Sequence, residues 1–473
     1  MRVTKRTGSR WLLVATLLVF LGWSLGSPIG GRAQQEGNNA VVQSYLNGNV
    51  VPAGSPAFID ASVFASGYSD ICATLYGIMT GGTGVTYPTA GAVIDARGIN
   101  SSLTSMTCSS GSPWQPTGGS YATEPSVILL PAATITIGLQ WQPPSHTRIV
   151  GEGPNLTILQ APSSFSGPMI HMGSDNYCGG AACTDIGIEH LGLVAQGAVT
   201  GILNRNSEEL SYVNDVAISG ISSGGIGLDI EGTSNAVYNL AVNSGPYSNI
   251  VFSGSGTCAQ INGTYDTRGI RGLTCNMTGS SSNAAVYLDG CSNSIEDVYI
   301  YGQIGDGILV GKYNTAQGDL LTNVNGASGV GNLIHISNSN AQNGNNNCPY
   351  QNSSSTANVA DLTILGATCS GCTNATIEDD LTGPVVTDAN VGMYAVGEPV
   401  LEKNVNDTWT AIGYSRYTTS PSLPTWLIGS GAPSGSCAPT GVLYSNIYSS
   451  YDQLDSLWAC AGGTQGIVWT PIK

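Results

Sequence analysis

The sequence predicts an all-β fold, a parallel β-helix built from stacked coils. The main observation is a four-residue motif: Asn or Asp, an apolar residue, any residue, and a second apolar residue. It begins at Asn155, Asp185, Asp215, Asn239, Asp297 and Asp361. The first three copies are 30 residues apart, the fourth follows after 24, and a degenerate copy at 272–275 interrupts the next gap. A short strand behind a turn residue, repeated about every 25 to 30 residues, is typical of a solenoid.

The composition and the local pattern agree with this fold. Only 9% of the 473 residues are charged and 64 are Gly, which is a turn-rich composition typical of all-β proteins. Short β-rich runs, each closed by Gly or Pro, lie before the repeat at 92–95, 127–131, 134–137 and 147–153. Just ahead of these runs, Ser69 or Asp70 can cap a short helix with Ile71 and Leu75 on one face. We expect this helix to cover the open N-terminal end of the solenoid.

The first 33 residues have the three parts of a signal peptide. Basic residues precede an apolar run from Trp11 to Leu25, and Gly31-Arg32-Ala33 provides a small-x-small cleavage site. An uncleaved membrane anchor is the alternative, but about 15 apolar residues is short for a span that needs roughly 20. We therefore expect residues 1–33 to be removed and the protein to be secreted, to the medium, the cell surface or the periplasm. The mature chain has no further stretch of membrane-spanning length.

The mature chain is expected to be strongly acidic. Five of the 14 Lys and Arg residues lie in the leader, which leaves 9 against 30 Asp and Glu, a formal charge of about −21. This charge argues against nucleic-acid binding, because that binding draws its affinity from Lys and Arg on phosphates. An acidic polysaccharide is also disfavoured unless a divalent cation bridges it to the protein, so Ca²⁺ is a possible cofactor.

All 12 cysteines follow the leader, an even number that favours disulfides in an exported protein. Proximity in the sequence suggests Cys72–Cys108, Cys178–Cys183, Cys258–Cys275 and Cys437–Cys460. It leaves Cys291, Cys348, Cys369 and Cys372 without an assigned partner. The last two form a Cys-x-x-Cys unit that could be half of a zinc site, but there is no second unit and no nearby His, which disfavours zinc.

Residues 126–159 carry a resemblance to a known superfamily. Leu130-Pro131 lies before a short strand, and Gly151-Glu152-Gly153 lies before the threonine-led strand 157–159. This order resembles the N-terminal coils of the pectate-lyase-like superfamily of right-handed parallel β-helix proteins. Segments 70–73, 93–98 and 415–421 resemble, more narrowly, secreted bacterial β-helix proteins without an established function. The resemblance implies a right-handed β-helix over about residues 90–390 and a carbohydrate ligand.

We expect five segments along the chain. After the leader, residues 34–55 form a flexible lead-in rich in Gln, Asn and Gly, and residues 56–395 form the β-helix with its N-terminal cap. Residues 396–430 connect it to a small disulfide-stapled β module at 431–473. Half of the eight tryptophans lie in the last 65 residues. The module is therefore expected to cap the helix, or to present aromatic side chains for sugar binding or assembly.

The repeated carboxylates are expected to be structural. Asn replaces Asp at Asn155 and Asn239, and a side-chain oxygen that accepts a backbone N–H explains both residue types, whereas acid–base chemistry would be lost at Asn. Charges outside the repeat are better candidates for chemistry. They are Arg268, Arg271, Glu296 and Asp306, which we expect within one or two coils of each other. Solvent-exposed turn residues would give the same pattern.

Two classes of function fit the sequence. The first is a polysaccharide lyase or glycoside hydrolase, in which Glu296 or Asp306 moves a proton and Arg268 or Arg271 stabilises charge. The second is a non-catalytic solenoid that binds a glycan or builds a cell-surface structure. Both have a polysaccharide or surface glycan as the partner, since a long Asn-, Ser- and Tyr-rich face suits polyhydroxylated ligands. The sequence predicts neither the glycan nor the oligomeric state.

Overall fold

The structure is a computed structural model that describes most of the chain between residues 57 and 379 and several strands beyond. The described residues are 57–65, 70–99, 105–174, 182–205, 207–208, 210–231, 244–265, 269–312, 316–327, 329–337, 359–360, 362–379, 401–403, 409–411, 426–429, 443–446, 457–463 and 466–471. The chain divides into two compact units, Met1–Phe58 and Ile59–Lys473, and the β-helix lies in the second.

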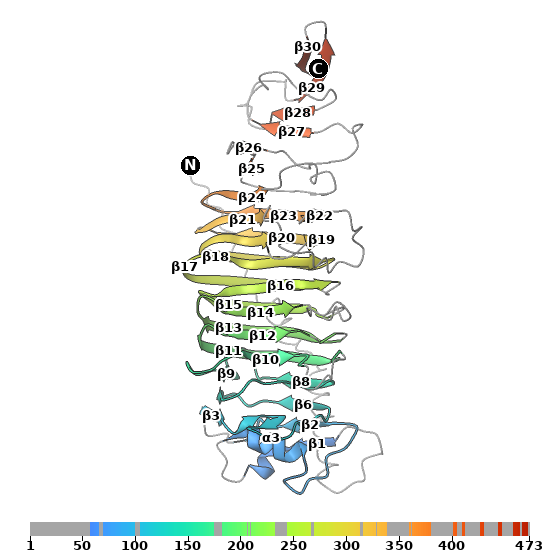
Figure 1. Ribbon diagram of the computed structural model, residues 1–473, viewed down its shortest axis with the longest axis vertical. Coiled ribbons are helices and arrows are strands. Elements are labelled where there is room, and N and C mark those ends of the chain that lie inside the picture. The colour runs from blue at the N-terminus through green and yellow to red at the C-terminus, as the bar shows by residue number, and fades with distance from the viewer. Residues whose placement is uncertain are drawn as a thin grey trace, which may run out of the picture. The chain divides into compact units, whose positions relative to one another are not determined.

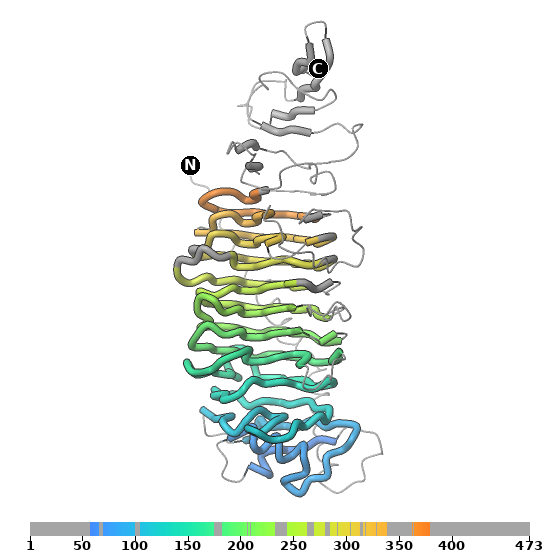
Figure 2. The backbone as a smooth tube through the Cα atoms, viewed as in Figure 1, coloured from blue at the N-terminus to red at the C-terminus, as the bar shows by residue number. Residues whose placement is uncertain are grey.

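Three stacks of parallel strands, here called stacks A, B and C, form a right-handed β-helix, which confirms the predicted fold class (Figure 1). The coils follow one another in chain order (Figure 2). Seven strands turn a corner between stacks A and B and belong to both: β11 (Ile186–Gly197), β13 (Tyr212–Ile221), β15 (Tyr247–Gly254), β17 (Ile270–Cys291), β18 (Ser294–Val310), β20 (Leu320–Gly326) and β23 (Thr363–Cys369).

Shorter strands complete the stacks. Stack A begins with β1 (Ala57–Asp60), β2 (Ala92–Asp95), β6 (Ser126–Leu129) and β8 (Thr147–Val150). Stack B begins with β3 (Ser105–Cys108), β7 (Thr134–Ile137) and β9 (Ile158–Gln160). Stack C contains the C-terminal parts of β17 and β18 together with β10 (Pro168–Met172), β12 (Thr200–Asn204), β14 (Ile226–Glu231), β16 (Thr257–Tyr265), β21 (Val330–Ile336), β24 (Ala375–Asp379) and β25 (Leu401–Lys403).

The remaining described strands lie beside these stacks or in separate sheets. β26 (Trp409–Ala411) pairs antiparallel with β25, and β19 (Ala316–Gln317) pairs with β22 (Val359–Ala360). β4 (Gly111–Ser112) and β5 (Gln115–Pro116) form a two-stranded sheet. A four-stranded sheet contains β27 (Trp426–Gly429), β28 (Leu443–Asn446), β29 (Leu457–Gly463) and β30 (Gly466–Pro471). It therefore includes residues ahead of position 431, where we expected the C-terminal module to begin.

The core of the solenoid consists of apolar side chains that repeat from coil to coil. One inward row is in register over six coils and consists of Val216, Ile250, Leu273, Val298, Val324 and Ala367. Each of these side chains is at most 1% exposed. Since burial of a Val, Leu or Ile side chain contributes about 1.5–3 kcal/mol, such rows are the main source of stability and set the register between coils.

The corner between stacks A and B places one residue of each coil in the left-handed backbone conformation. These residues have φ angles between 52° and 78° and stand opposite one another in seven successive coils: His190, Asp215, Asn249, Gly272, Asp297, Asn323 and Gly366. Gly, Asn, Asp and His adopt this conformation more readily than other residues do. The corner therefore explains why Asp, Asn and Gly exchange in the repeated motif.

A second corner explains the glycine five positions after Asp215 and after Asp297. Gly220 and Gly302 end the stack B segments of β13 and β18 with φ angles of 76° and 108°. A Cβ atom on either residue would lie 2.1 Å from a carbonyl oxygen of the preceding coil. Only Gly satisfies both the backbone angle and the close approach.

The register between coils differs from the one that the motif spacing predicted. Asp185 and Asp215 are on neighbouring coils, but Val216 pairs with Leu191 and not with the residue after Asp185. Asp185 lies at an earlier corner, beside His146, and also has a left-handed φ of 55°. The motif, spaced by 30 residues, thus aligned Asp185 with Asp215 although they lie at two different corners that require the same residue types. Asn155 lies in the turn before β9, and the copy at 239–242 and the first residue of the copy at 361–364 fall outside the described residues.

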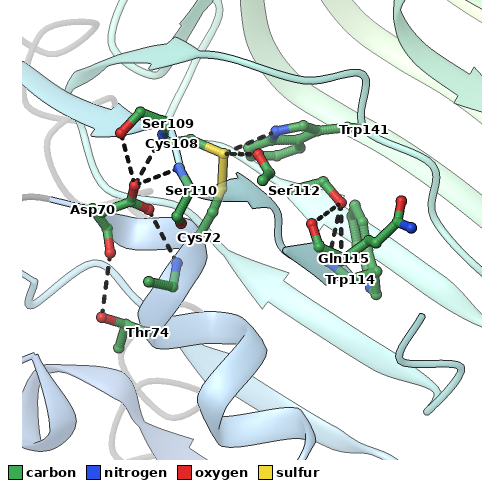
Figure 3. The surroundings of a disulfide bond; sticks show 12 residues. Asp70, Cys72, Thr74, Cys108, Ser109, Ser110, Ser112, Trp114, Gln115 and Trp141 are labelled. Carbon is green, nitrogen blue, oxygen red and sulfur yellow. Dashed lines mark hydrogen bonds between the residues drawn. A yellow bond between two sulfur atoms is a disulfide. The ribbon is translucent and has the colours of Figure 1, made fainter. Parts of the chain in front are cut away.

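The predicted capping helix is confirmed as α3 (Ile71–Met79), which packs against β3, β4 and the 3-10 helix η1 (Ala61–Phe64). Asp70 is its N-cap, and one carboxylate oxygen accepts the N–H of Ala73 at 3.0 Å (Figure 3). The other oxygen accepts the N–H groups of Ser109 and Ser110 at 2.9 and 2.8 Å. Asp70 therefore joins the helix to the turn after β3.

Disulfides and aromatic rings fix this end of the solenoid. Cys72 of α3 is bonded to Cys108 of β3, as predicted, and the indole N–H of Trp141 donates to the Cys108 sulfur (Figure 3). Trp141 packs edge-on against Trp114, with 6.0 Å between ring centroids, and neither ring is exposed. The helix is thus covalently attached to the first coils.

Five further cysteines test the predicted pairing. Cys258–Cys275 is present as predicted, and Cys183 is also disulfide-bonded. Cys369 and Cys372 are bonded to each other, which corrects the sequence analysis, where both were left without a partner and weighed as half of a zinc site. A bonded pair has no thiolate to offer a metal. No helix within the described ranges is long and apolar enough to cross a membrane.

Candidate functional site

Arg271 and Glu296 lie side by side on neighbouring coils, as the sequence analysis expected. They are register partners in stack A, and Arg271 Nε lies 3.4 Å from Glu296 Oε2. The guanidinium side chain is 57% exposed and the carboxylate side chain 25%. An exposed pair of this kind contributes little to stability, so both groups remain available to a ligand. Arg268, the third member of the predicted set on this side, falls outside the described residues.

Asp306 does not share a face with Glu296. Both belong to β18, but the strand turns at Asp297, crosses stack B, and turns again at Gly302 before it reaches Asp306 in stack C. From their separation of ten residues in the sequence, Glu296 and Asp306 were expected to flank one groove. In the structure those ten residues carry the chain around two corners.

A row of polar and aromatic side chains faces outward on stack B, next to this corner. Tyr299 is 44% exposed, and its ring centroid lies 5.5 Å from that of Tyr301. Their neighbours across the strands are Thr274 and Asn276 on β17, and Asn325 on β20. All of these are partly exposed. The row combines ring faces with amide and hydroxyl groups on a regular sheet, which is a surface suited to sugar rings.

Asp306 belongs to a compact polar cluster on stack C. Its carboxylate lies 3.0 Å from Nδ1 of His335 and accepts the amide N–H of Asn332 at 3.0 Å. The same amide group donates to the carboxylate of Glu378. One ligand atom each from Asp306, His335 and Glu378 lie within 4.8 Å of one another. This donor set, two carboxylates and one imidazole, is of a kind that binds metal ions.

The sequence analysis found only one member of this cluster. That member is Asp306; the sequence analysis did not single out Asn332, His335 or Glu378. They meet because His335 pairs with Glu378, while Asn332 pairs with Ala375 on the same two strands and also stands opposite Asp306. No local pattern could have revealed this, since β21 and β24 are separated by a long insertion.

Another buried carboxyl group lies on an earlier coil of stack C. Asp229 is 4% exposed, and burial together with the adjacent charge of Glu231 raises the pKa of its carboxyl group to about 8. Arg205 on the preceding coil pairs with Glu231, with Nε 2.9 Å from Oε2. A carboxyl group with a raised pKa beside a second carboxyl group resembles a general acid and base pair. Because Asp229 is so deeply covered, no polymer reaches it in this conformation, and we assign it no catalytic role.

Two other histidines, His146 and His190, lie at corners of the coils. His146 faces Asp185, with 3.5 Å between Nδ1 and Oδ2, and His190 faces Asp215 at 2.7 Å. Both histidines and both aspartates have left-handed backbone angles. These contacts agree with the structural role predicted for the repeat carboxylates.

Comparison with known proteins shows only the fold. No family model and no curated protein matches the chain. Among solved structures, it is similar to ORF18 of Geobacillus virus E2, at 12% identity over 88% of this chain and 86% of that one, with a TM-score of 0.38. It is also similar to the A-module of the Azotobacter vinelandii mannuronan C-5 epimerase AlgE4, at 12% identity over 68% and 91%, with a TM-score of 0.33.

A third similar structure is the catalytic domain of a GH87 α-1,3-glucanase in complex with tetrasaccharides. Here the identity is 11% over 74% of this chain and 70% of that one, with a TM-score of 0.21. Likenesses this distant carry no argument about activity. The fold itself rests on the strand register described above, and the chain is a right-handed parallel β-helix.

Proposed function

We propose that the protein binds a polysaccharide along the outward face of stack B, over β17, β18 and β20. The observation that carries this proposal is the exposed pair Tyr299 and Tyr301 within a row of amide and hydroxyl side chains. Sugar rings pack their C–H faces on aromatic rings, while their hydroxyl groups exchange hydrogen bonds with Asn, Ser and Thr. Strands about 4.8 Å apart repeat such groups at regular intervals along the stack, which suits an extended polymer.

The acidic charge of the chain favours a neutral glycan over an acidic one. With 30 Asp and Glu against 14 Lys and Arg, the surface repels polyanions unless a cation such as Ca²⁺ lies between the two. We therefore expect retention on neutral polysaccharides without added Ca²⁺, and any retention on uronate polymers to depend on it.

The proposed setting is outside the cytoplasm. The second unit contains three described disulfides, and Cys183 is also disulfide-bonded. Such bonds persist in oxidising compartments. The proposal includes removal of residues 1–33, because the sequence there has the three parts of a signal peptide. The intact mass of the exported protein checks this, since a retained leader would contradict it.

A polysaccharide panel tests the binding proposal. The mature protein is passed over immobilised neutral and acidic polysaccharides, with and without Ca²⁺. Tyr299→Ala, Tyr301→Ala and the double variant are compared with Tyr121→Ala, a matched change near the N-terminal end of the solenoid, ahead of β6. We expect the β18 variants to lose about 10-fold or more in affinity, since each stacked ring contributes on the order of 1–2 kcal/mol. Equal retention of all variants would contradict the proposed face.

Catalysis on a uronate-containing glycan is the second candidate function, and one observation favours it. Glu296 is a base and Arg271 a charge stabiliser, and they lie in register beside the corner, with 3.4 Å between Nε and Oε2. In β-elimination, Glu296 would accept the proton α to a carboxyl group whose charge Arg271 neutralises. A double bond would form as the C–O bond at the β-carbon breaks, and the leaving oxygen would take a proton from water. Two carboxylates flanking one bond, as glycoside hydrolysis requires, are not provided by Glu296 and Asp306, which face different stacks.

The catalytic proposal is tested by counting the new unsaturated and reducing ends that the protein releases from a polysaccharide. If the protein is a lyase, Glu296→Gln and Arg271→Gln should each lower turnover by about 10²-fold, because general acid–base steps contribute that much. Asp306→Asn should leave turnover near the wild-type rate. Turnover that survives both stack A substitutions would remove the catalytic site, and binding without turnover would leave the glycan-binding function alone.

A further inference from the structure

We propose that Asp306, Asn332, His335 and Glu378 form a binding site for one divalent transition-metal ion of the Zn²⁺ type. The site lies on stack C and is separate from the proposed glycan face on stack B. Three adjacent coils contribute to it through β18, β21 and β24. A bound ion would therefore connect three rungs of the solenoid.

The geometry brings the donor atoms close enough to share one ion. Single ligand atoms of Asp306, His335 and Glu378 all lie within 4.8 Å of one another. Two donors of a tetrahedral Zn²⁺, each at about 2.0–2.2 Å, are separated by roughly 3.4 Å, so the cluster needs a contraction of up to about 1.4 Å. The side chains of Asp306 and His335 are 17% and 19% exposed, and Glu378 is 9% exposed. Two carboxylates so close together and so little hydrated repel each other unless positive charge lies between them.

Asn332 provides an independent indication of a ligand. It is 4% exposed, and its Nδ2 donates to the carboxylates of both Asp306 and Glu378. Its Oδ1 is buried and has no hydrogen-bond partner in the described structure. An orphaned amide oxygen is costly, and it is rare in folded proteins. The NH₂ group occupies the position between the carboxylates that a cation would take.

A rotation of the Asn332 amide resolves this conflict. Turning the group by about 180° about its last torsion exchanges the nitrogen and oxygen positions at little cost, since the two orientations are nearly isosteric. The oxygen would then point between the two carboxylates, which is unfavourable without a cation and favourable with one. The bound state would thus have one imidazole nitrogen, two carboxylate oxygens and one amide oxygen as donors.

This donor set points to a transition metal and not to Ca²⁺. Imidazole is a preferred ligand of Zn²⁺ and its neighbours in the first row, whereas Ca²⁺ takes six to eight oxygen ligands at 2.3–2.6 Å. The cluster offers three oxygen-bearing side chains and one nitrogen donor. A four-coordinate ion is satisfied by these groups, and Ca²⁺ is not.

Metal content and thermal unfolding of the full, untagged mature protein test the proposal. Protein stripped with EDTA is dialysed against ZnCl₂, MnCl₂ or CaCl₂, and bound metal is counted by mass spectrometry. We expect one Zn²⁺ per chain and a raised unfolding temperature, because a ligand of the folded state stabilises it by mass action. Glu378→Gln and His335→Gln should each weaken Zn²⁺ binding at least 10-fold. Asp185→Asn, which alters a different His–Asp pair beside His146, should bind as the wild type does.

Asn332→Asp separates a metal site from a purely structural hydrogen-bond cluster. The substitution removes both N–H donors and adds a third carboxylate, so the metal-free protein should unfold at a lower temperature than the wild type. Zn²⁺ should restore that temperature and bind at least as tightly as to the wild type. The proposal is overturned if Zn²⁺ gives no rescue, if wild type and Glu378→Gln bind equally, or if Ca²⁺ binds where Zn²⁺ does not.

Discussion

His190 and Asp215 occupy the same corner position on neighbouring coils, and His190 Nδ1 lies 2.7 Å from Asp215 Oδ2. Similar contacts link the corner elsewhere, since Asn323 donates to Asp297 at 2.8 Å. The corner is thus a column of left-handed residues whose side chains reach toward the next coil. Asp215 is part of this column and has no proton-transfer role in our proposals. Asn in its place should preserve the fold.

The backbone angle at the corner can be tested at Asn323, whose φ is 52°. Asn323→Ala should lower the free energy of unfolding by about 2 kcal/mol. The left-handed conformation costs Ala about 1–2 kcal/mol, whereas Asn tolerates it through local hydrogen bonds, and the bond to Asp297 is lost as well. Asn323→Gly loses the bond but avoids most of the strain, so it should cost clearly less. Urea denaturation measures both. Equal losses for Ala and Gly would show that the backbone angle does not govern this position.

The buried carboxyl group of Asp229 predicts a pH dependence of stability. Its pKa in the folded protein is about 8, raised mainly by burial, whereas an unfolded Asp titrates near 4. The folded state therefore holds a proton that the unfolded chain releases, and this contribution to stability is lost as the pH rises from about 4 toward 8. Asp229→Asn, which imitates the neutral acid, should flatten that decline.

Urea unfolding at several pH values between 4.5 and 8.5 provides the measurement for Asp229. Asp297→Asn serves as the control, because that carboxylate is exposed. If the wild type and Asp229→Asn lose stability with pH at the same rate, Asp229 is ionised in the folded protein and our assignment is wrong.

Asp70 is expected to give the opposite pH dependence of stability from Asp229. Burial raises the pKa of its carboxyl group, but hydrogen bonds from Ala73 and Ser110 outweigh burial and leave the pKa below its ordinary value. The stabilisation is present above pH 4 and is lost as the pH falls through the lowered pKa. Asp70→Ala should cost about 1–3 kcal/mol at pH 7, and less at pH 3, through the loss of the helix cap and the bonds to the turn after β3. A variant as stable as the wild type at pH 7 would contradict this role.

The disulfides should differ in their effect on stability according to the length of chain they enclose. Cys258 and Cys275 are 17 residues apart, whereas Cys369 and Cys372 are separated by 3. In the loop-entropy model, replacing the first pair by Ser should cost about 3 kcal/mol, and replacing the second pair much less. Thermal unfolding of the two double variants measures the difference. A larger loss from the shorter loop would indicate that its contribution is not entropic.

The features that the sequence predicts correctly are those determined by neighbouring residues in the chain. Helix 71–79 and strand 92–95 have their own capping or alternation signals, and the structure has them at those positions. Coil register was wrong at Asp185 because every corner accepts the same residue types, so a motif cannot tell one corner from another. The cluster around His335 was missed because 43 residues separate the corner residues Asn323 and Gly366, and no periodicity spans such an insertion.

The Cys258–Cys275 bond joins β16 to β17, two consecutive coils near the middle of the solenoid. In a solenoid each coil depends on its neighbours, so fraying starts at an end and proceeds one coil at a time. A covalent link between two coils stops such unzipping, since neither coil can leave without the other. In the oxidised protein, the coils on either side of β16–β17 should therefore exchange their amide hydrogens at two separate rates. After reduction of the disulfide, the two groups of coils should exchange at a common rate.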